Sequence, residues 1–278
     1  MNRVGKLFRL FIVFAVVAIV GACSGGSSER FLDQAKKSHA AGDNVAAMIQ
    51  LKNALQRNPQ DGEARYLLGV IYNENAQGAS AEIELRRASE LGLIEGGRVI
   101  VQLGRALLLQ DSYQKLLEEI KPAPAFEDSA LASIHALRGS AHLALNQLAI
   151  AEQSFDRALA LQPEYVDALL GQARLAGSAN KLDEAARLIE RALAGAPKNI
   201  EAWLMKGDVA RLRNDEAGAT AAYQKVLELK PNNVLAHSNI ASLHIAAGRF
   251  DDARKHIEQA RKLAPANPMT NYLLALLE

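Results

Sequence analysis

The chain has 278 residues, with 32 Lys and Arg against 31 Asp and Glu, and a single cysteine, Cys23. A chain so close to neutrality lacks the concentrated basic face that nucleic-acid binding requires, so we expect no nucleic-acid partner. One thiol allows neither an internal disulfide nor a metal site built from several cysteines, so packing must stabilise the fold.

The first 22 residues have the order of a signal peptide. Residues 1–9 carry Arg3, Lys6 and Arg9 and no acidic residue, and residues 10–20 are all apolar. This apolar run is long enough for a signal peptide but shorter than the roughly 20 residues of a transmembrane helix. Because three basic residues lie in this segment, the rest of the chain has 29 basic and 31 acidic residues, a formal charge of −2.

The sequence around Cys23 predicts a membrane anchor. Val20-Gly21-Ala22-Cys23 resembles the lipobox of bacterial lipoproteins. The resemblance implies cleavage before Cys23 and acylation of its thiol, and several acyl chains hold a protein stably on a membrane. Because Ser24 and not Asp follows, the resemblance also implies a Gram-negative envelope protein, lipid-anchored in the outer membrane and facing the periplasm. The alternative is an uncleaved membrane anchor with an incidental cysteine.

The chain is thus predicted to have three parts. Residues 1–22 form the signal peptide, residues 23–28 carry the acylated cysteine and a flexible Gly/Ser tether, and residues 29–278 fold.

A 34-residue period runs through the folded part. Prolines recur every 34 residues, at Pro163, Pro197, Pro231 and Pro265. Small and large apolar residues repeat at constant offsets before them, and the pattern resembles the tetratricopeptide repeat (TPR). Trp203 and Gly207 stand at the aromatic and glycine positions of that motif.

The TPR pattern implies pairs of antiparallel helices. Small residues let the two backbones approach, and the proline ends the second helix because it cannot donate the next backbone hydrogen bond. We therefore predict an all-α fold, a right-handed α-solenoid of about seven helix-turn-helix repeats plus a partial eighth. The repeats are expected near 28–61, 62–96, 97–131, 132–165, 166–199, 200–233, 234–267 and 268–278.

Two repeats depart from this pattern. The second helix of 97–131 is expected around residues 112–121, where Pro122 and Pro124 cut it short. This irregular unit is a local insertion, a hinge or a ledge for a partner. The apolar segment 268–278 either caps the last repeat alone or continues in a longer natural protein.

No catalytic or metal-binding motif stands out, so we predict a protein that is not an enzyme and has no cofactor or metal. The histidines at His135 and His142, and at His237 and His244, are spaced i, i+7 on predicted helices. Both pairs fall at positions where other repeats carry packing aromatic residues, so we interpret them as packing residues.

The resemblance to TPR arrays implies a peptide-binding groove on the concave face, built from the first helix of each repeat. Its mixed apolar and polar side chains suit an extended peptide or a partner helix. They do not reproduce the carboxylate clamp of TPR co-chaperones, because Leu32 and Ala136 stand where lysine is wanted. The expected groove residues are Tyr66, Val70, Asn73, Ser140, Leu143, Arg174, Asp208, Arg211, Ser242 and Ile245.

Residues 46–72 and 103–120, together with the lipobox, are similar to a particular family, the TPR-repeat lipoproteins of the PEP-CTERM/exosortase system. That resemblance implies an envelope scaffold in exopolysaccharide production and protein sorting, with other envelope proteins as partners. The alternative is a general outer-membrane TPR lipoprotein that scaffolds pilus biogenesis, outer-membrane assembly or peptidoglycan synthases.

Overall fold

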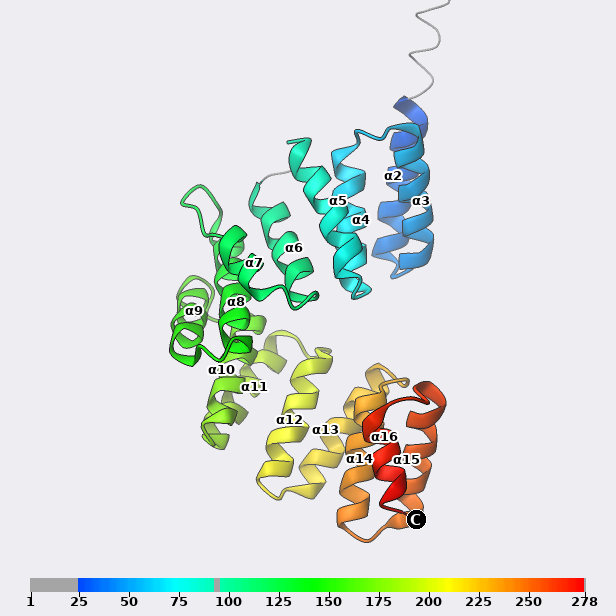
Figure 1. Ribbon diagram of the computed structural model, residues 1–278, viewed down its shortest axis with the longest axis vertical. Helices are drawn as coiled ribbons and strands as arrows, with labels where there is room; N and C mark the ends of the chain where they lie inside the picture. Colours follow the sequence, from blue (N-terminus) through cyan, green and yellow to red (C-terminus); the bar gives the residue numbers. More distant parts are fainter. Residues whose placement is uncertain (1–24, 93–95, 278) are drawn as a thin grey trace, which may run out of the picture. The chain divides into compact units, whose positions relative to one another are not determined.

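The computed structural model describes residues 25–92 and 96–277, which form fifteen helices and no strand (Figure 1). The predicted all-α solenoid is confirmed. The signal peptide, the lipobox and Cys23 lie outside the described residues. The chain divides after Asn146 into two compact units, which we describe one at a time.

In the first unit, helices pair as antiparallel hairpins: α2 with α3, α4 with α5, and α6 with α7, followed by α8. Successive first helices also touch one another, α4 on α6 and α6 on α8. The helices are α2 (Gly25–Ala40), α3 (Asn44–Arg57), α4 (Gly62–Glu74), α5 (Gly78–Glu90), α6 (Gly96–Leu108), α7 (Tyr113–Glu119) and α8 (Asp128–Ala144).

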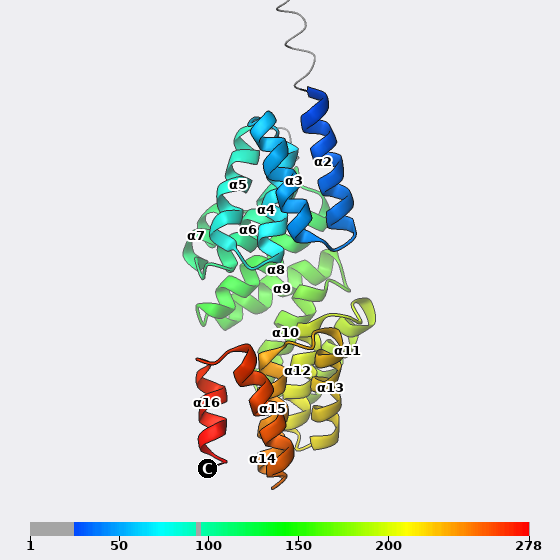
Figure 2. The ribbon, with the colours of Figure 1, turned by 90° about the vertical axis from the view of Figure 1, so that its right-hand side faces the viewer.

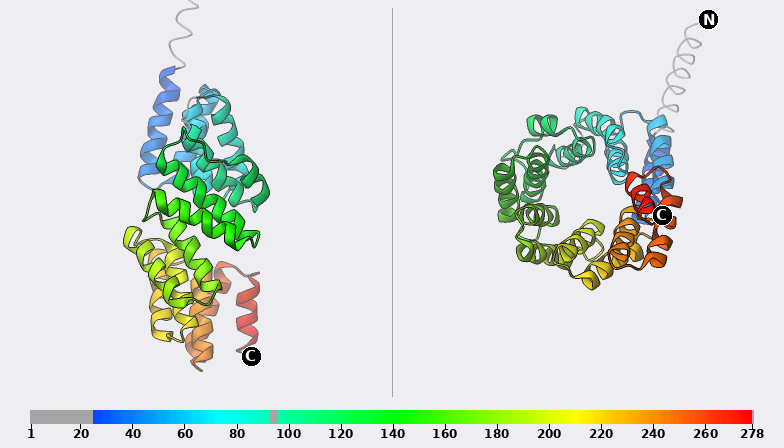
Figure 3. Two further views of the ribbon diagram at one scale, coloured as in Figure 1. Left: turned by 90° about the vertical axis from the view of Figure 1, so that its left-hand side faces the viewer. Right: turned by 60° about the horizontal axis from the view of Figure 1, so that its bottom comes forward.

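In the second unit, α9 packs on α10, and three hairpins follow in chain order before the last helix, α16 (Figures 1 and 3). The helices are α9 (Leu148–Leu161), α10 (Val166–Ser178), α11 (Leu182–Gly195), α12 (Ile200–Leu212), α13 (Glu216–Leu229), α14 (Val234–Ala246), α15 (Phe250–Leu263) and α16 (Pro268–Ala275). Helix α16 packs on α14 and α15 (Figure 2).

Small residues of the repeat let neighbouring helices approach closely. A Cβ atom added at Gly171 of α10 would lie 2.3 Å from the ring of Phe155, which is fully buried on α9. A Cβ atom at Gly207 of α12 would lie 2.3 Å from the ring of Tyr223 on α13. Glycine therefore seats the large side chain at these two positions, as the small-and-large pattern of the sequence predicts.

The turn inside each hairpin contains one residue in the left-handed region. These residues are spaced 34 or 35 apart and have φ between 54° and 79°. Glycine, asparagine and aspartate adopt this conformation most readily, so Ala76 is the unfavourable choice in the series. The set is Gly42, Ala76, Asp111, Asn146, Asn180, Asn214 and Gly248.

The proline that ends a repeat is tied to the following chain through its carbonyl oxygen. Trp203 Nε1 lies 2.9 Å from the Pro197 oxygen and His237 Nε2 lies 3.1 Å from the Pro231 oxygen, six residues back in each case. Arg65 Nε donates to the Pro59 oxygen at 3.0 Å, also across six residues. One repeat position thus supplies a hydrogen-bond donor for the carbonyl oxygen of the proline that follows the second helix.

The hairpin of α6 and α7 is irregular. Helix α7 has only seven residues, and residues 120–127 form no helix before α8 begins at Asp128. Helix α8 therefore starts four residues before the repeat boundary expected at 132. Arg138 of α8 donates to the carbonyl oxygens of Leu117 and Ile120, at 2.7 and 3.0 Å, which satisfies the end of α7.

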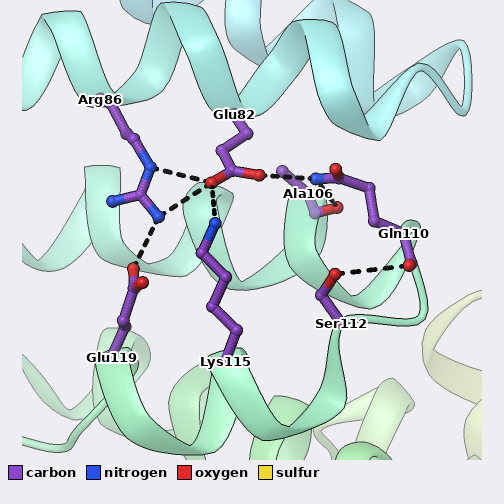
Figure 4. A network of polar contacts seen from close by, with 7 residues as sticks. All are labelled: Glu82, Arg86, Ala106, Gln110, Ser112, Lys115 and Glu119. Carbon is purple, nitrogen blue, oxygen red and sulfur yellow. Dashed lines mark hydrogen bonds and ion pairs between the residues drawn. The ribbon is translucent and has the colours of Figure 1, made fainter.

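A charged network holds the short α7 against α5 (Figure 4). Glu82 accepts from Lys115 at 2.6 Å, from Gln110 at 2.9 Å and from Arg86 at 2.9 Å, and Arg86 also donates to Glu119 at 2.7 Å. Burial alone raises the pKa of Glu82, but these three donors outweigh it and lower that pKa from 4.5 to about 2. The network adds to the apolar packing of Leu116, which lies in one buried cluster with Ala81 and Leu85 of α5.

Among the described residues, no helix combines the length and the apolar composition that crossing a bilayer requires.

Candidate partner-binding face

We define the first-helix face as the solvent side of α4, α6 and α8 in the first unit and of α10, α12, α14 and α16 in the second. All ten residues expected to line the groove lie on α4, α8, α10, α12 and α14. None of the ten is fully buried.

The first unit has a cavity of about 270 Å³ on this face, between α4 and α6. Val70 and Asn73, two of the expected residues, contribute to it from α4. Its walls combine apolar and polar groups, which suits a short apolar side chain with a hydrogen-bonding neighbour. The lining residues are Val70, Asn73, Glu74, Gln102, Arg105, Leu108 and Leu109.

Asn73 joins the two helices of this cavity. Its Nδ2 atom donates to the backbone oxygen of Gln102 at 2.9 Å and to the side-chain oxygen of Gln102 at 3.1 Å. Its Oδ1 atom is buried and has no hydrogen-bond partner within the described part of the chain. The Asn73 amide thus links α4 to α6, and its oxygen is enclosed at the junction of the two helices.

Tyr66 lies one helical turn before Val70 on α4, and the Arg98 guanidinium carbon lies 5.3 Å from the centre of its ring. This distance is typical of a cation–π contact. At the other end of α4, the Glu74 carboxylate is hydrogen-bonded to His39 Nε2 at 2.9 Å and accepts from Asn44 Nδ2 at 3.1 Å. The face of α4 and α6 therefore presents an aromatic ring, an arginine and apolar side chains close together.

The other expected residues lie in separate places. Ser140 and Leu143 are half-buried on α8. Arg174 is exposed on α10 and forms an ion pair with Glu201 of α12. This pair links successive first helices, as Lys36 and Glu63 do at 2.7 Å in the first unit.

Asp208 is part of a hydrogen bond inside its hairpin. Its carboxylate accepts from the hydroxyl of Tyr223 at 2.7 Å. Burial, followed by this hydrogen bond, raises the pKa of Tyr223. Arg211, exposed on α12, interacts with the same hydroxyl, so the two expected groove residues of α12 support the Tyr223 side chain.

The first-helix face of α14 and α16 is more apolar. Ser242 is exposed, whereas Ile245 packs partly against a core cluster of Ala241, Ile257 and Leu273. Three large apolar side chains on these two helices are half or more exposed, namely Leu235, Met269 and Tyr272.

Helix α6 contributes residues to this face that were not among those expected from the sequence. Arg105, Leu108 and Leu109 line the cavity together with Gln102, and Arg98 covers Tyr66. The repeat offset could have found them, because Arg105 follows Val70 by 35 residues. The irregular repeat hid this correspondence.

The repeat pattern predicts packing roles for His237 and His244 of α14, and the structure places His256 of α15 beside them. His237 and His256 have ring centres 5.3 Å apart, and those of His244 and His256 are 5.8 Å apart. Burial, with the charges of His237 and His244, lowers the pKa of His256. Within the described ranges, no group of three or more His, Cys, Asp or Glu side chains is arranged to hold a metal ion.

Comparison with known proteins agrees with the fold. Two family models, both described as tetratricopeptide repeat, match this chain. One matches residues 137–200 and 170–234, and the other matches residues 38–92 and 210–277. The chain belongs to the tetratricopeptide repeat superfamily, whose members are generally non-enzymatic scaffolds that bind other proteins. A search of curated protein sequences gave no significant match.

Several solved structures share this fold at low sequence identity. A tetratricopeptide repeat protein from Parabacteroides merdae is 20% identical, with a TM-score of 0.62 over 91% of this chain and 99% of that one. A chain of the Cut9–Hcn1 complex of the APC/C is 16% identical, with a TM-score of 0.67 over 87% of this chain and 48% of that one. PilF of Pseudomonas aeruginosa is 18% identical, with a TM-score of 0.54 over 80% of this chain and 99% of that one.

Proposed function

We propose that the protein is a non-enzymatic scaffold that binds segments of other envelope proteins on its first-helix face. The observation that carries this proposal is the cavity between α4 and α6, whose lining includes Val70, Leu108 and Leu109. Apolar walls give affinity for an anchoring side chain, and the polar side chains that line the same cavity can orient the bound peptide.

The proposed location is the outer membrane, facing the periplasm. It is supported by the basic, apolar and small residues that precede Cys23 and by their resemblance to a lipobox. Acylation of Cys23 would anchor the chain and leave the repeats free to bind partners in the periplasm.

The proposed pathway is exopolysaccharide production and sorting of PEP-CTERM proteins. It is supported by the resemblance of residues 46–72 and 103–120 to the TPR lipoproteins of that system. The alternative, a general outer-membrane scaffold for pili, outer-membrane assembly or peptidoglycan synthesis, makes the same use of the first-helix face with other partners.

In-cell crosslinking of a C-terminally tagged protein, followed by membrane fractionation and mass spectrometry, tests this proposal. We expect exopolysaccharide-export or sorting components in the outer-membrane fraction. Recovery of pilus, outer-membrane assembly or peptidoglycan proteins would refute the pathway and favour the alternative. Cys23→Ala is the control for anchoring, and it should release the protein from the membrane while keeping the repeats folded.

A further inference from the structure

Two histidine nitrogens face each other across the hairpin of α14 and α15. The Nδ1 atom of His237 lies 3.0 Å from the Nδ1 atom of His256. Both side chains are half-buried, so solvent reaches them. The two residues are 19 apart in the sequence and come from different helices, which is why spacing along one helix does not predict the pair.

The fold determines the orientation of His237. Its Nε2 atom is bonded to the Pro231 oxygen at 3.1 Å, in the place where Trp203 bonds to Pro197. A carbonyl oxygen only accepts, so Nε2 carries the hydrogen, and in the neutral ring Nδ1 then carries the lone pair. A backbone carbonyl bound to the second nitrogen is also how many metal-binding histidines are oriented.

The third histidine is occupied by a different contact. His244 Nδ1 accepts from Arg249 Nε at 3.0 Å, and Arg249 forms an ion pair with Glu216 of α13. This arrangement leaves the pair of His237 and His256, whose Nδ1 atoms are in hydrogen-bond contact, and not a triad.

We propose that His237 and His256 bind a copper(II) or nickel(II) ion through their Nδ1 atoms, with water in the remaining coordination positions. With metal–nitrogen bonds of about 2.0–2.1 Å, two ligands at a right angle are about 2.9 Å apart, whereas tetrahedral ligands are about 3.3 Å apart. The observed 3.0 Å, which is also a hydrogen-bond distance, lies within a few tenths of an ångström of both separations, so a small rotation of the rings admits an ion. Imidazole nitrogens suit copper(II) and nickel(II), and the order of affinities of divalent metals places copper(II) above zinc.

The neighbouring charges limit the affinity without excluding the ion. Arg249 and Lys255 are positive, whereas Asp252 lies one helical turn before His256 and Glu216 neutralises Arg249. A bound ion would link α14 to α15, so it would stabilise the last complete hairpin of the described chain.

Isothermal titration of the full chain, without a histidine tag and carrying Cys23→Ser to remove the thiol, tests this site with nickel chloride and zinc chloride. We expect one nickel ion per chain, bound more tightly than zinc, and a rise in the melting temperature with nickel. His237→Gln and His256→Gln should each weaken nickel binding at least tenfold. His142→Gln, on α8 in the other unit, is the matched control and should bind as the parent does.

Circular dichroism of each variant shows whether it is folded, and His256→Gln keeps the test valid if loss of the Pro231 bond unfolds His237→Gln. Absence of nickel binding, or binding that neither variant weakens, would show a hydrogen-bonded histidine pair only and would overturn the proposal.

Discussion

Replacing Gly171 by alanine tests the packing that joins α9 to α10. The new Cβ atom would lie 2.3 Å from Cε1 and Cζ of Phe155, more than 1 Å inside the usual contact of about 3.5 Å. Phe155 is fully buried and cannot move into solvent. Overpacking of this kind costs about 1–3 kcal/mol, and the severity of the contact favours the upper part of that range.

Alanine also has a higher helix propensity than glycine by about 1 kcal/mol, which offsets part of the cost. We therefore expect Gly171→Ala to lower the free energy of unfolding by about 1–2 kcal/mol. Gly177, on the same helix, has no atom within 4 Å of its added Cβ. Gly177→Ala is the matched control, and it should raise the free energy of unfolding by about 0.5–1 kcal/mol.

Urea unfolding followed by circular dichroism measures this difference. Native-state hydrogen exchange of α9 and α10 should accompany it, because repeat arrays can unfold in parts. Phe155→Leu in the Gly171→Ala background should recover part of the stability, since the smaller side chain makes room for the methyl group. Equal effects of the two alanine substitutions would refute the close approach of α9 and α10.

Three further predictions concern other parts of the chain. Ala76→Gly should raise the free energy of unfolding, measured with urea, by about 0.5–1 kcal/mol. Ala76 is exposed and has φ 56°, a conformation that strains alanine and not glycine. A loss of stability would contradict the turn geometry. The lowered pKa of Glu82 gives stability that is complete above pH 4.5 and lost as the pH falls toward 2. Its partners Lys115 and Arg86 are 45% and 38% exposed, so with solvent screening we expect Glu82→Gln to cost about 1–2 kcal/mol at pH 7 and less than half of that at pH 3. An equal cost in urea titrations at both pH values would show that the charge of Glu82 is not what stabilises α7. Cys23→Ala should move the protein from the membrane to the soluble fraction after lysis, and unchanged fractionation would exclude the lipid anchor.

The sequence predicted the fold well because a helical repeat places its packing residues at fixed offsets. Ala151, Ala185, Ala219 and Ala253 share one offset, and all four are fully buried. Periodicity of this kind reports the faces that helices bury, and it does not depend on which repeats contact each other.

The candidate sites were predicted less completely, because they depend on contacts between helices. The resemblance to TPR arrays gave Val70 and Asn73 but not Arg98 or Arg105, since the offset changes at the irregular repeat. The bond between Tyr223 and Asp208 joins two positions that the pattern treats separately. The His237–His256 pair likewise joins the two helices of one hairpin, and only side-chain geometry reveals it.

The central claim is that partners bind on the first-helix face. A photo-crosslinking amino acid placed at Val70, in the cavity of α4 and α6, tests it in cells most directly. The same amino acid at Ile83, which is 55% exposed on the second helix α5, is the control. We predict crosslinks to a discrete partner protein from Val70 and none to that protein from Ile83. Crosslinks of equal yield from both positions, or from Ile83 alone, would contradict the claim.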